Sequence, residues 1–315
     1  MKGIIEQAFK GNTDWWRYIV GFFVIFFIWQ IGSSIQGIFV YLKLVQKGLK
    51  ADEILAKLSD MEVLMTTLES NFNFFLLLLG FVFGFGGVVV VIKLLHNLQL
   101  KQLITSRTHI DWKRIGLSFG VIAGLLILSV LLDYKLSPAD YQLNFKLQRF
   151  LILALIGIVM VPIQTTFEEL LFRGYLMQGF GSIFKSRAVA LILTSVLFGG
   201  LHVFNPEVAK LGYQALIVYI GTGFFLGIVT LMDEGLELAI GFHAGNNLIT
   251  ALLVTADWTA FKTHSVFRYL GEPSLVRGVY IPVLIFYPIL TLIFSGIYKW
   301  KNWKQKLFGK IEQTK

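Results

Sequence analysis

The sequence predicts an all-α, polytopic integral membrane protein with about eight transmembrane helices. Hydrophobic residues make up 56% of its 315 residues and aromatic residues 15%, and the mean hydropathy is +0.70. This composition is too apolar for a water-soluble globular protein. Apolar runs also recur along the whole chain at about the 20-residue length that a helix needs to cross a bilayer.

Eight apolar runs are the predicted spans. In chain order they cover residues 18–44, 73–95, 115–132, 150–167, 188–204, 213–232, 236–254 and 279–298. The first run is longer than the core of a signal peptide and lacks an A-x-A-like cleavage site, so we expect it to remain as an anchor, tilted or overrunning the membrane. The fourth run is expected to continue as an amphipathic helix to about Met177.

The distribution of lysine and arginine predicts the orientation of the chain. Eight crossings leave both termini on one side, where the segments hold sixteen Lys and Arg residues against eleven on the other, with Arg173 set aside. Because positive residues are retained inside, both termini are expected in the cytoplasm, at a plasma membrane or, in a bacterium, an inner membrane. The net charge of +9 then reflects topology and contact with anionic membrane lipids, and no motif indicates binding to nucleic acid.

Two further patterns concern the membrane surface and helix packing. In the outer segment 51–70, apolar residues recur at helical spacing among charged ones, which predicts a short amphipathic helix on the membrane. Glycine pairs within the spans, Gly241 with Gly245 among them, have the small-x-x-x-small spacing of closely packed helices. This pair flanks His243, so we expect it to hold the histidine near a neighbouring helix.

The candidate site begins with two adjacent glutamates at the end of the fourth run. A charged side chain inside a bilayer costs about 3 kcal/mol on insertion scales, so such residues pair, line a wet cavity or take part in function. Glu169 and Arg173 stand at i and i+4, in the order that favours an ion pair supporting the helix packing. Glu168 has Phe172 at that spacing and no cation, which leaves its carboxylate to face a cavity as a general base.

The following runs carry polar residues at matching positions. Phe198 and His202 share a helix face, as do His243 and Asn247. We expect His202 to share the proton of a water molecule with Glu168, while His243 and Asn247 donate two hydrogen bonds to a developing oxyanion. The alternative is that the histidines are hydrogen-bonded packing residues.

Three patterns, E-E-x-x-x-R, F-x-x-x-H and H-x-x-x-N, follow one another on consecutive membrane helices. In this order they resemble the CAAX protease and bacteriocin-processing (CPBP, Abi) family, whose eukaryotic branch is the type II CAAX prenyl endopeptidase. The match covers about residues 148–255 and lacks no motif position. Each pattern alone is weakly specific, but the ordered set is strongly specific. The resemblance implies an eight-helix fold enclosing an intramembrane catalytic cavity that opens toward the cytoplasmic leaflet.

The resemblance also implies an activity. It is that of an endopeptidase that hydrolyses a peptide bond with a water activated by glutamate. Carried onto this sequence, Glu168 is the base, His202 its partner, and His243 and Asn247 are the oxyanion donors. A peptide or a lipidated, membrane-associated protein is the expected substrate, and a short pheromone precursor fits as well as a prenylated protein.

The same match divides the chain into three regions. Residues 1–147 lie outside it and are expected to form an N-terminal membrane region with three transmembrane helices. Residues 148–255 form the catalytic core. Residues 256–315 supply an outer loop, the last transmembrane helix and a basic cytoplasmic tail.

Other intramembrane protease chemistries lack their residues. The sequence has no cysteine, no H-E-x-x-H zinc helix, no G-x-S-G serine motif and no aspartate within a span. Glu168, Glu169, His202 and His243 offer oxygen and nitrogen ligands for zinc, and members of the family have been called metalloproteases. Glu169 is committed to Arg173, however, and no H-x-x-x-H pair is present. We therefore expect no required cofactor, with zinc as the alternative.

Three classes of function are compatible with these residues. The first is an intramembrane endopeptidase. The second is a non-proteolytic membrane adaptor or bacteriocin self-immunity protein of the same fold. The third is a transporter with a glutamate–histidine proton relay, which is least favoured because no broken-helix repeat is visible.

Overall fold

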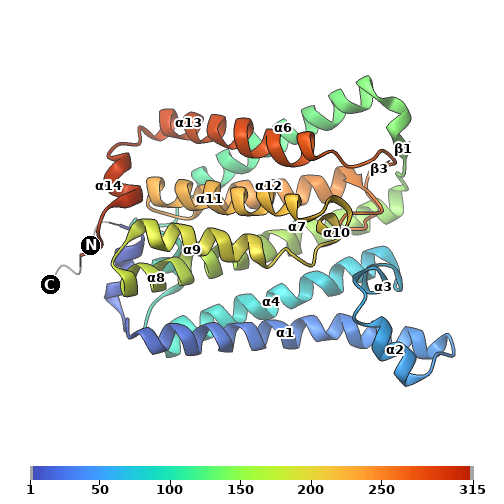
Figure 1. Ribbon diagram of the computed structural model, residues 1–315, viewed down its shortest axis with the longest axis horizontal. Helices are drawn as coiled ribbons and strands as arrows, with labels where there is room; N and C mark the ends of the chain where they lie inside the picture. Colours follow the sequence, from blue (N-terminus) through green and yellow to red (C-terminus); the bar gives the residue numbers. More distant parts are fainter. Residues whose placement is uncertain (1–2, 313–315) are drawn as a thin grey trace.

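The computed structural model describes residues 3–312 as helices that run side by side along one long axis (Figure 1). The helices are α1 (Trp15–Gln46), α2 (Ala51–Lys57), α3 (Met61–Thr66), α4 (Ser70–Leu94), α5 (Leu100–Ile104), α6 (Trp112–Leu136), α7 (Leu147–Glu169), α8 (Met177–Phe184), α9 (Arg187–Gly200), α10 (Pro206–Leu211), α11 (Leu216–Asp233), α12 (Glu237–Leu253), α13 (Tyr287–Tyr298) and α14 (Trp303–Phe308). Short 3₁₀ helices cover Ile5–Lys10, Pro138–Asp140 and Tyr213–Ala215. π-Helical turns cover Leu170–Leu176, Val276–Tyr280 and Pro282–Phe286.

Six helical segments within residues 3–312 are long and apolar enough to cross a membrane. They are Trp15–Gln46, Ser70–Leu94, Trp112–Leu136, Leu147–Phe184, Tyr213–Asp233 and Val276–Tyr298. The all-α membrane fold is therefore confirmed. The two other predicted spans form α9, with 14 residues, and α12, with 17. At 1.5 Å per residue these helices are roughly 21 and 26 Å long, shorter than the hydrocarbon core of a bilayer at about 30 Å.

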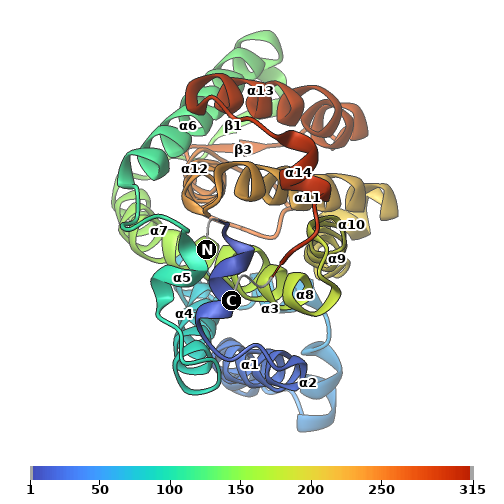
Figure 2. The same ribbon diagram turned by 90° about the vertical axis from the view of Figure 1, so that its left-hand side faces the viewer.

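The helices that carry the candidate site lie in the middle of the bundle. α4 packs on α1 and on α7, while α12 packs on α6 and α7, and α11 packs on α9. Figure 2, a view along the bundle, shows α7, α8 and α9 between the α1–α4 pair and the group formed by α6, α12 and α13. The N-terminal helices therefore pack directly against the helices with the glutamates and histidines.

Glycines bring α12 close to α6, as their spacing predicts. A Cβ atom on Gly241 would overlap the carbonyl oxygen of Ile115, and one on Gly245 would lie 2.5 Å from a methyl carbon of Ile122. Neither glycine has a positive φ, so the requirement is for space and not for an unusual backbone conformation. His243 lies between them on α12 and faces α7.

One end of the bundle, which we call the basic end, gathers the first and last described residues, α5, α14 and the α8–α9 and α11–α12 turns (Figures 1 and 2). Ion pairs join these segments across the end. They are Arg107–Asp233 (2.7 Å), Arg107–Glu237 (3.1 Å), Arg114–Asp233, Arg187–Glu6 (2.5 Å), Arg187–Glu234 (3.4 Å) and Lys306–Glu234 (3.8 Å). The basic end is thus closed by contacts between segments far apart in the sequence.

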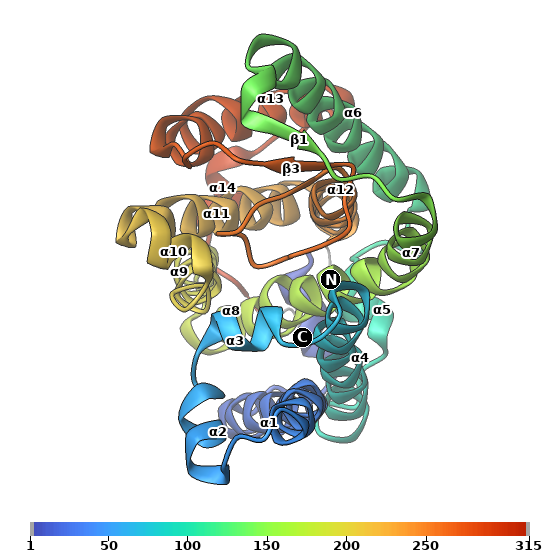
Figure 3. The same cartoon turned by 90° about the vertical axis from the view of Figure 1, so that its right-hand side faces the viewer.

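The opposite end is formed by α2, α3, α10 and a small sheet (Figure 3). β3 (Phe267–Tyr269) pairs antiparallel with β1 (Tyr141–Leu143) and parallel with β2 (Val254–Thr255). The sheet ties the α6–α7 connection to the long connection after α12. It was not predicted, because two- and three-residue strands leave no readable alternation in a sequence.

Two sequence predictions need correction. The segment 51–70 is not one amphipathic helix but α2 and α3, because the Asp60 side chain accepts a hydrogen bond from the backbone N–H of Glu62 and starts a new helix. The continuation of the fourth span is not amphipathic either. Residues Leu170–Leu176 are buried on every side, since they cross the centre of the bundle.

Candidate active site

The end of α7 places the two adjacent glutamates in different surroundings. Glu169 is completely buried, and its Oε1 lies 2.9 Å from Nη1 of Arg173, which is equally buried. The predicted ion pair is therefore present. It forms across the start of the π-helical turn Leu170–Leu176, where the widened backbone replaces the expected α-helix.

Glu168 keeps part of its surface exposed. Its side chain is 14% accessible, whereas that of Glu169 is fully enclosed. Its Oε1 accepts a hydrogen bond of 2.7 Å from Nε2 of Gln164, one helical turn earlier. No arginine or lysine pairs with Glu168 in the described part of the chain, as its helix position predicted. Its carboxylate is consequently the one of the pair that can meet a water molecule or a substrate.

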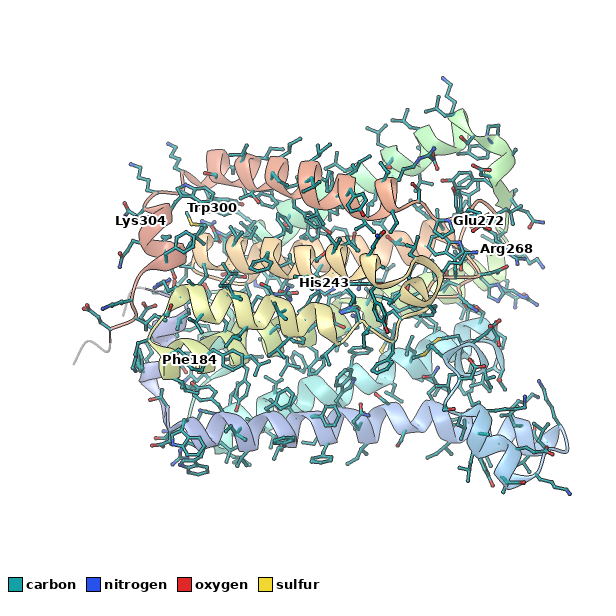
Figure 4. The ribbon with its side chains drawn as sticks, viewed as in Figure 1. Phe184, His243, Arg268, Glu272, Trp300 and Lys304 are labelled. Carbon is teal, nitrogen blue, oxygen red and sulfur yellow. The ribbon has the colours of Figure 1, made fainter. Side chains whose placement is uncertain are left out.

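His243 lies between the two carboxylates, near the middle of the bundle (Figure 4). Its Nδ1 is 2.8 Å from Oε1 of Glu169, and its Nε2 is 3.4 Å from Oε2 of Glu168. The imidazole therefore connects the buried Glu169–Arg173 pair to Glu168. The predicted role of His243 as an oxyanion donor stays a prediction, and in this structure both of its ring nitrogens face a glutamate carboxylate.

His202 lies in the turn that follows α9, because α9 ends at Gly200 and not at residue 204 as expected. Its Nδ1 is 2.7 Å from the carbonyl oxygen of Phe198, which makes Nδ1 the protonated nitrogen and leaves Nε2 as an acceptor. Its ring stacks on Tyr219, with centroids 4.3 Å apart and planes inclined by 20°. In the described residues no hydrogen bond joins His202 to Glu168, so their partnership stays a prediction.

Asn247 extends the polar row along α12, one turn after His243. Its Nδ2 donates a hydrogen bond of 3.2 Å to Oε1 of Gln164, and its Oδ1 accepts one of 3.1 Å from Asn246. Gln164 thus connects Asn247 with Glu168 through the two ends of one amide. The polar side chains of α7 and α12 are therefore held relative to each other by hydrogen bonds.

Phe198 forms the apolar wall of the site. It is 2% exposed, and the guanidinium carbon of Arg173 lies 4.2 Å from its ring centre. The ring also contacts His202 and His243, with centroids 4.9 and 6.0 Å away. This packing shields the Glu169–Arg173 pair from water, and a shielded pair is held more firmly than an exposed one.

Sequence reasoning missed Gln164 and Tyr219. Gln164 could have been found, since it is an amide inside an apolar run, four residues before Glu168 and on the same helix face. Tyr219 could not, because its contact with His202 joins α11 to the turn after α9 and depends on how these helices pack.

The donor set does not match a usual zinc site. Such a site needs three convergent protein ligands, and residues 3–312 contain no group of three His, Asp or Glu placed to hold a metal ion. Glu169 is engaged by both Arg173 and His243, and Nδ1 of His202 is bonded to a backbone carbonyl. The expectation that no metal is required stays a prediction.

Two comparisons with known proteins found similar sequences. The family model described as "Type II CAAX prenyl endopeptidase Rce1-like" matches residues 147–249, the stretch from α7 into α12. The chain is also 31% identical, over 308 residues, to "Uncharacterized protein YyaK" of Bacillus subtilis (strain 168), covering 95% of this chain and 96% of that protein. No solved structure matches significantly.

Proposed function

The chain belongs to the Rce1-like family of type II CAAX prenyl endopeptidases, and on this premise we propose that it is an intramembrane endopeptidase using Glu168 as its general base. The substrate class is a peptide or a lipidated, membrane-associated protein. The family and the helices make the chain an integral membrane protein with a CAAX-protease-like fold. The catalytic activity, the residue roles and the absence of a required metal are parts of the proposal.

One observation carries it: neighbouring glutamates have opposite environments. Glu169 is enclosed and neutralised by Arg173, while Glu168 is partly exposed and oriented by Gln164 and His243. A base must be reachable by water and must stay fixed in direction, and Glu168 satisfies both conditions.

The proposed reaction follows from these positions. Glu168 takes a proton from a water molecule as the water oxygen bonds to the peptide carbonyl carbon. The carbonyl oxygen then carries negative charge. The side-chain N–H of Asn247 gives up its hydrogen bond to Gln164 and donates to this oxygen, which stabilises the charge. When the C–N bond breaks, the proton held by Glu168 passes to the leaving nitrogen, and the products are a carboxylic acid and an amine. Nε2 of His202 accepts a hydrogen bond from the attacking water and so orients it.

We further propose that the peptide enters from the end opposite the basic end. Toward the basic end, Leu171–Met177 and Leu238–Phe242 are buried throughout. Toward the other end, Glu168, His202 and Asn247 are partly exposed. With the basic end in the cytoplasm, this access faces the outer leaflet, opposite to the cytoplasmic opening that the family resemblance implies.

The assay uses purified protein and a peptide library read by mass spectrometry. Glu168→Gln should lower kcat by about 10²–10⁴-fold, since it keeps the shape and removes the proton acceptor. Asn247→Ala should lower kcat by about 10²–10³-fold, since the oxyanion is bound mainly in the transition state. Glu272→Gln, in a side chain that is 82% exposed, is the matched control and should leave kcat unchanged.

Three outcomes would contradict the proposal. Full turnover by Glu168→Gln together with inactivity of a folded Glu169→Gln would show that the roles of the two carboxylates are reversed. Activity lost on chelation and restored by zinc would replace the metal-free mechanism. Retention of the cellular function by Glu168→Gln would favour the adaptor or self-immunity protein over the peptidase.

A further inference from the structure

Three side-chain amides form a chain of hydrogen bonds that ends at the proposed base. Nδ2 of Asn246 donates to Oδ1 of Asn247 at 3.1 Å, and Nδ2 of Asn247 donates to Oε1 of Gln164 at 3.2 Å. Nε2 of Gln164 then donates to Oε1 of Glu168 at 2.7 Å. Every N–H in this chain points toward Glu168, so the chain has one direction.

The carboxylate at the end of the chain sets this direction. An ionised carboxylate only accepts hydrogen bonds, whereas a side-chain amide donates through its nitrogen and accepts through its oxygen. Gln164 must therefore turn its nitrogen to Glu168, which leaves its oxygen for Asn247. Asn247 in turn must offer its nitrogen, which leaves its oxygen to be satisfied by a donor. Asn246 supplies that donor from the neighbouring position on α12.

Burial makes the direction costly to reverse. Gln164, the middle link, is only 4% exposed. In such surroundings two amide oxygens that face each other lose a hydrogen bond that water does not replace. Reversal of one amide would therefore force reversal of the next, until an amide oxygen faced the carboxylate of Glu168. The direction of the Asn247 amide thus depends on the residue at position 246.

On the basis of the endopeptidase function proposed above, we propose that Asn246 is a positioning residue for the hydrolysis. It keeps the amide of Asn247 oriented when the N–H of that amide leaves Gln164 for the oxyanion. Through the chain it also holds Oε1 of Glu168, which leaves Oε2 for the attacking water. Neither Asn246 nor Gln164 is a defined position of the three sequence patterns.

The first experiment detects the chain without any assay of activity. Asn246→Asp keeps the size of the side chain but replaces its donor with an acceptor, so it forces the amides to reverse. We expect the unfolding equilibrium constant, from denaturant titration in detergent, to rise about tenfold. Asn97→Asp, at an exposed site, is the matched control and should change it by less than about threefold. In a Glu168→Gln background the effect of Asn246→Asp should nearly vanish, since the amide introduced there can donate to the reversed chain.

Replacement of Gln164 separates the chain from simple charge repulsion. Repulsion between carboxylates at positions 246 and 168 would act whatever side chain lies at position 164, whereas coupling through amides needs Gln164. In a Gln164→Leu background, Glu168→Gln should therefore no longer relieve Asn246→Asp. Coupling of equal size with and without Gln164 would overturn the proposal, and so would its absence in the otherwise unchanged protein.

The second experiment compares kinetic constants of the purified protein in the peptide assay. Asn246→Asp should lower kcat by about 10²–10³-fold and change KM by less than about threefold, because the reversed amide presents an oxygen to the oxyanion. Asn246→Leu removes the donor without adding an acceptor and should lower kcat less, whereas a packing role would make this larger change of shape the more harmful. Asn247→Ala combined with Asn246→Asp should be no slower than Asn247→Ala alone.

The outcomes distinguish this role from the proposed function itself. Normal kcat in a folded Asn246→Asp, or equal losses in Asn246→Asp and Asn246→Leu, would overturn the role of Asn246 and leave the peptidase in place. Full turnover by Glu168→Gln would instead refute the proposed mechanism, and with it the role of Asn246 in hydrolysis, even if the coupling of stability were observed.

Discussion

Glu168 and Glu169 are neighbours in the sequence but have different environments. Glu168 is partly exposed and suited to a chemical role, whereas Glu169 is buried and suited to a structural one. The buried Glu169 accepts contacts from both Arg173 and His243 through the same oxygen, Oε1. Its Oε2 and Nε of Arg173 are buried without a hydrogen-bond partner. The pair is therefore held by few contacts inside an apolar surround, and the loss of one partner leaves the other charge uncompensated.

Arg173→Ala tests this arrangement by exposing the cost of the unpaired Glu169. We expect the free energy of unfolding to fall by about 3–5 kcal/mol, as for other broken buried ion pairs. Denaturant titration of the purified protein in detergent measures it. The control is Arg268→Ala, in an ion pair whose side chains are 43% and 77% exposed, which should cost less than about 1 kcal/mol. Equal losses for the two variants would mean that Arg173 is effectively in contact with water.

At the scale of whole elements, α12 owes its position to its glycines. Both Gly241 and Gly245 face α6, and the opposite side of the same helix presents His243 and Asn247 to α7. The close packing of α12 on α6 therefore fixes how far His243 and Asn247 lie from α7.

Gly241→Ala should displace α12, because the new methyl group overlaps the Ile115 carbonyl oxygen. We expect a loss of about 1–3 kcal/mol of stability together with reduced activity, measured by denaturant titration and the peptide assay. Gly124→Ala in α6 is the matched control, since a Cβ there meets no atom within 4 Å. It should be neutral or stabilising by up to about 1 kcal/mol, as expected for alanine in a helix. A tolerated Gly241→Ala would contradict the close packing of α12 on α6.

His96, just after α4, connects elements at the basic end. Its Nδ1 is 2.7 Å from the carbonyl oxygen of Asn12, its Nε2 is 3.0 Å from the Tyr175 hydroxyl, and its ring lies 4.4 Å from that of Tyr18. Burial lowers the pKa of His96 below its ordinary value of 6.5, and the nearby Arg17 cation acts in the same direction. The folded protein therefore holds His96 neutral where the unfolded chain would bind a proton.

This pKa shift predicts a dependence of stability on pH. Because the folded pKa lies below the unfolded one, the contribution is complete above about pH 6.5 and is lost as the pH falls, with a slope of at most about 1.4 kcal/mol per pH unit. Melting temperatures between pH 5 and pH 8 should show a shallower decline for His96→Gln than for the unchanged protein. His109→Gln, at an exposed site, should keep the original slope. Identical slopes in all three proteins would exclude His96 as the cause.

On the scale of the whole molecule, the two ends of the bundle differ in charge and closure. Within residues 3–312, the segments at the basic end hold fourteen basic and seven acidic residues, against eleven and ten at the other end. Ion pairs centred on Asp233 and Glu234 close the basic end, whereas the partly exposed groups of the site face the other way. Orientation and access to the site can therefore be tested together.

The chain contains no cysteine, so single cysteines can be labelled without background. Lys304 and Glu272 lie at opposite ends of the bundle (Figure 4). In intact cells a membrane-impermeant methanethiosulfonate should modify Glu272→Cys and Asn246→Cys, but should modify Lys304→Cys only after permeabilisation. Labelling of Lys304→Cys in intact cells would reverse the orientation. If Asn246→Cys, like Lys304→Cys, were labelled only after permeabilisation, the entrance to the site would lie at the basic end.

The sequence alone determined the features that depend on local spacing and composition. The membrane fold follows from the length of apolar runs, and the Glu169–Arg173 pair follows from i, i+4 geometry. The motif set identified the family, because the order of the three short patterns can be read from the sequence without knowing which residues are in contact. The division at residues 147 and 255 remains a prediction.

Tertiary structure alone decided which groups meet across helices. It placed His243 between both glutamates, joined Asn247 to Glu168 through Gln164, and stacked Tyr219 on His202. It also formed the small sheet of β1, β3 and β2. These contacts link residues distant in the chain, and their geometry depends on how the helices pack, which is set by the summed shape of many side chains and by no local pattern.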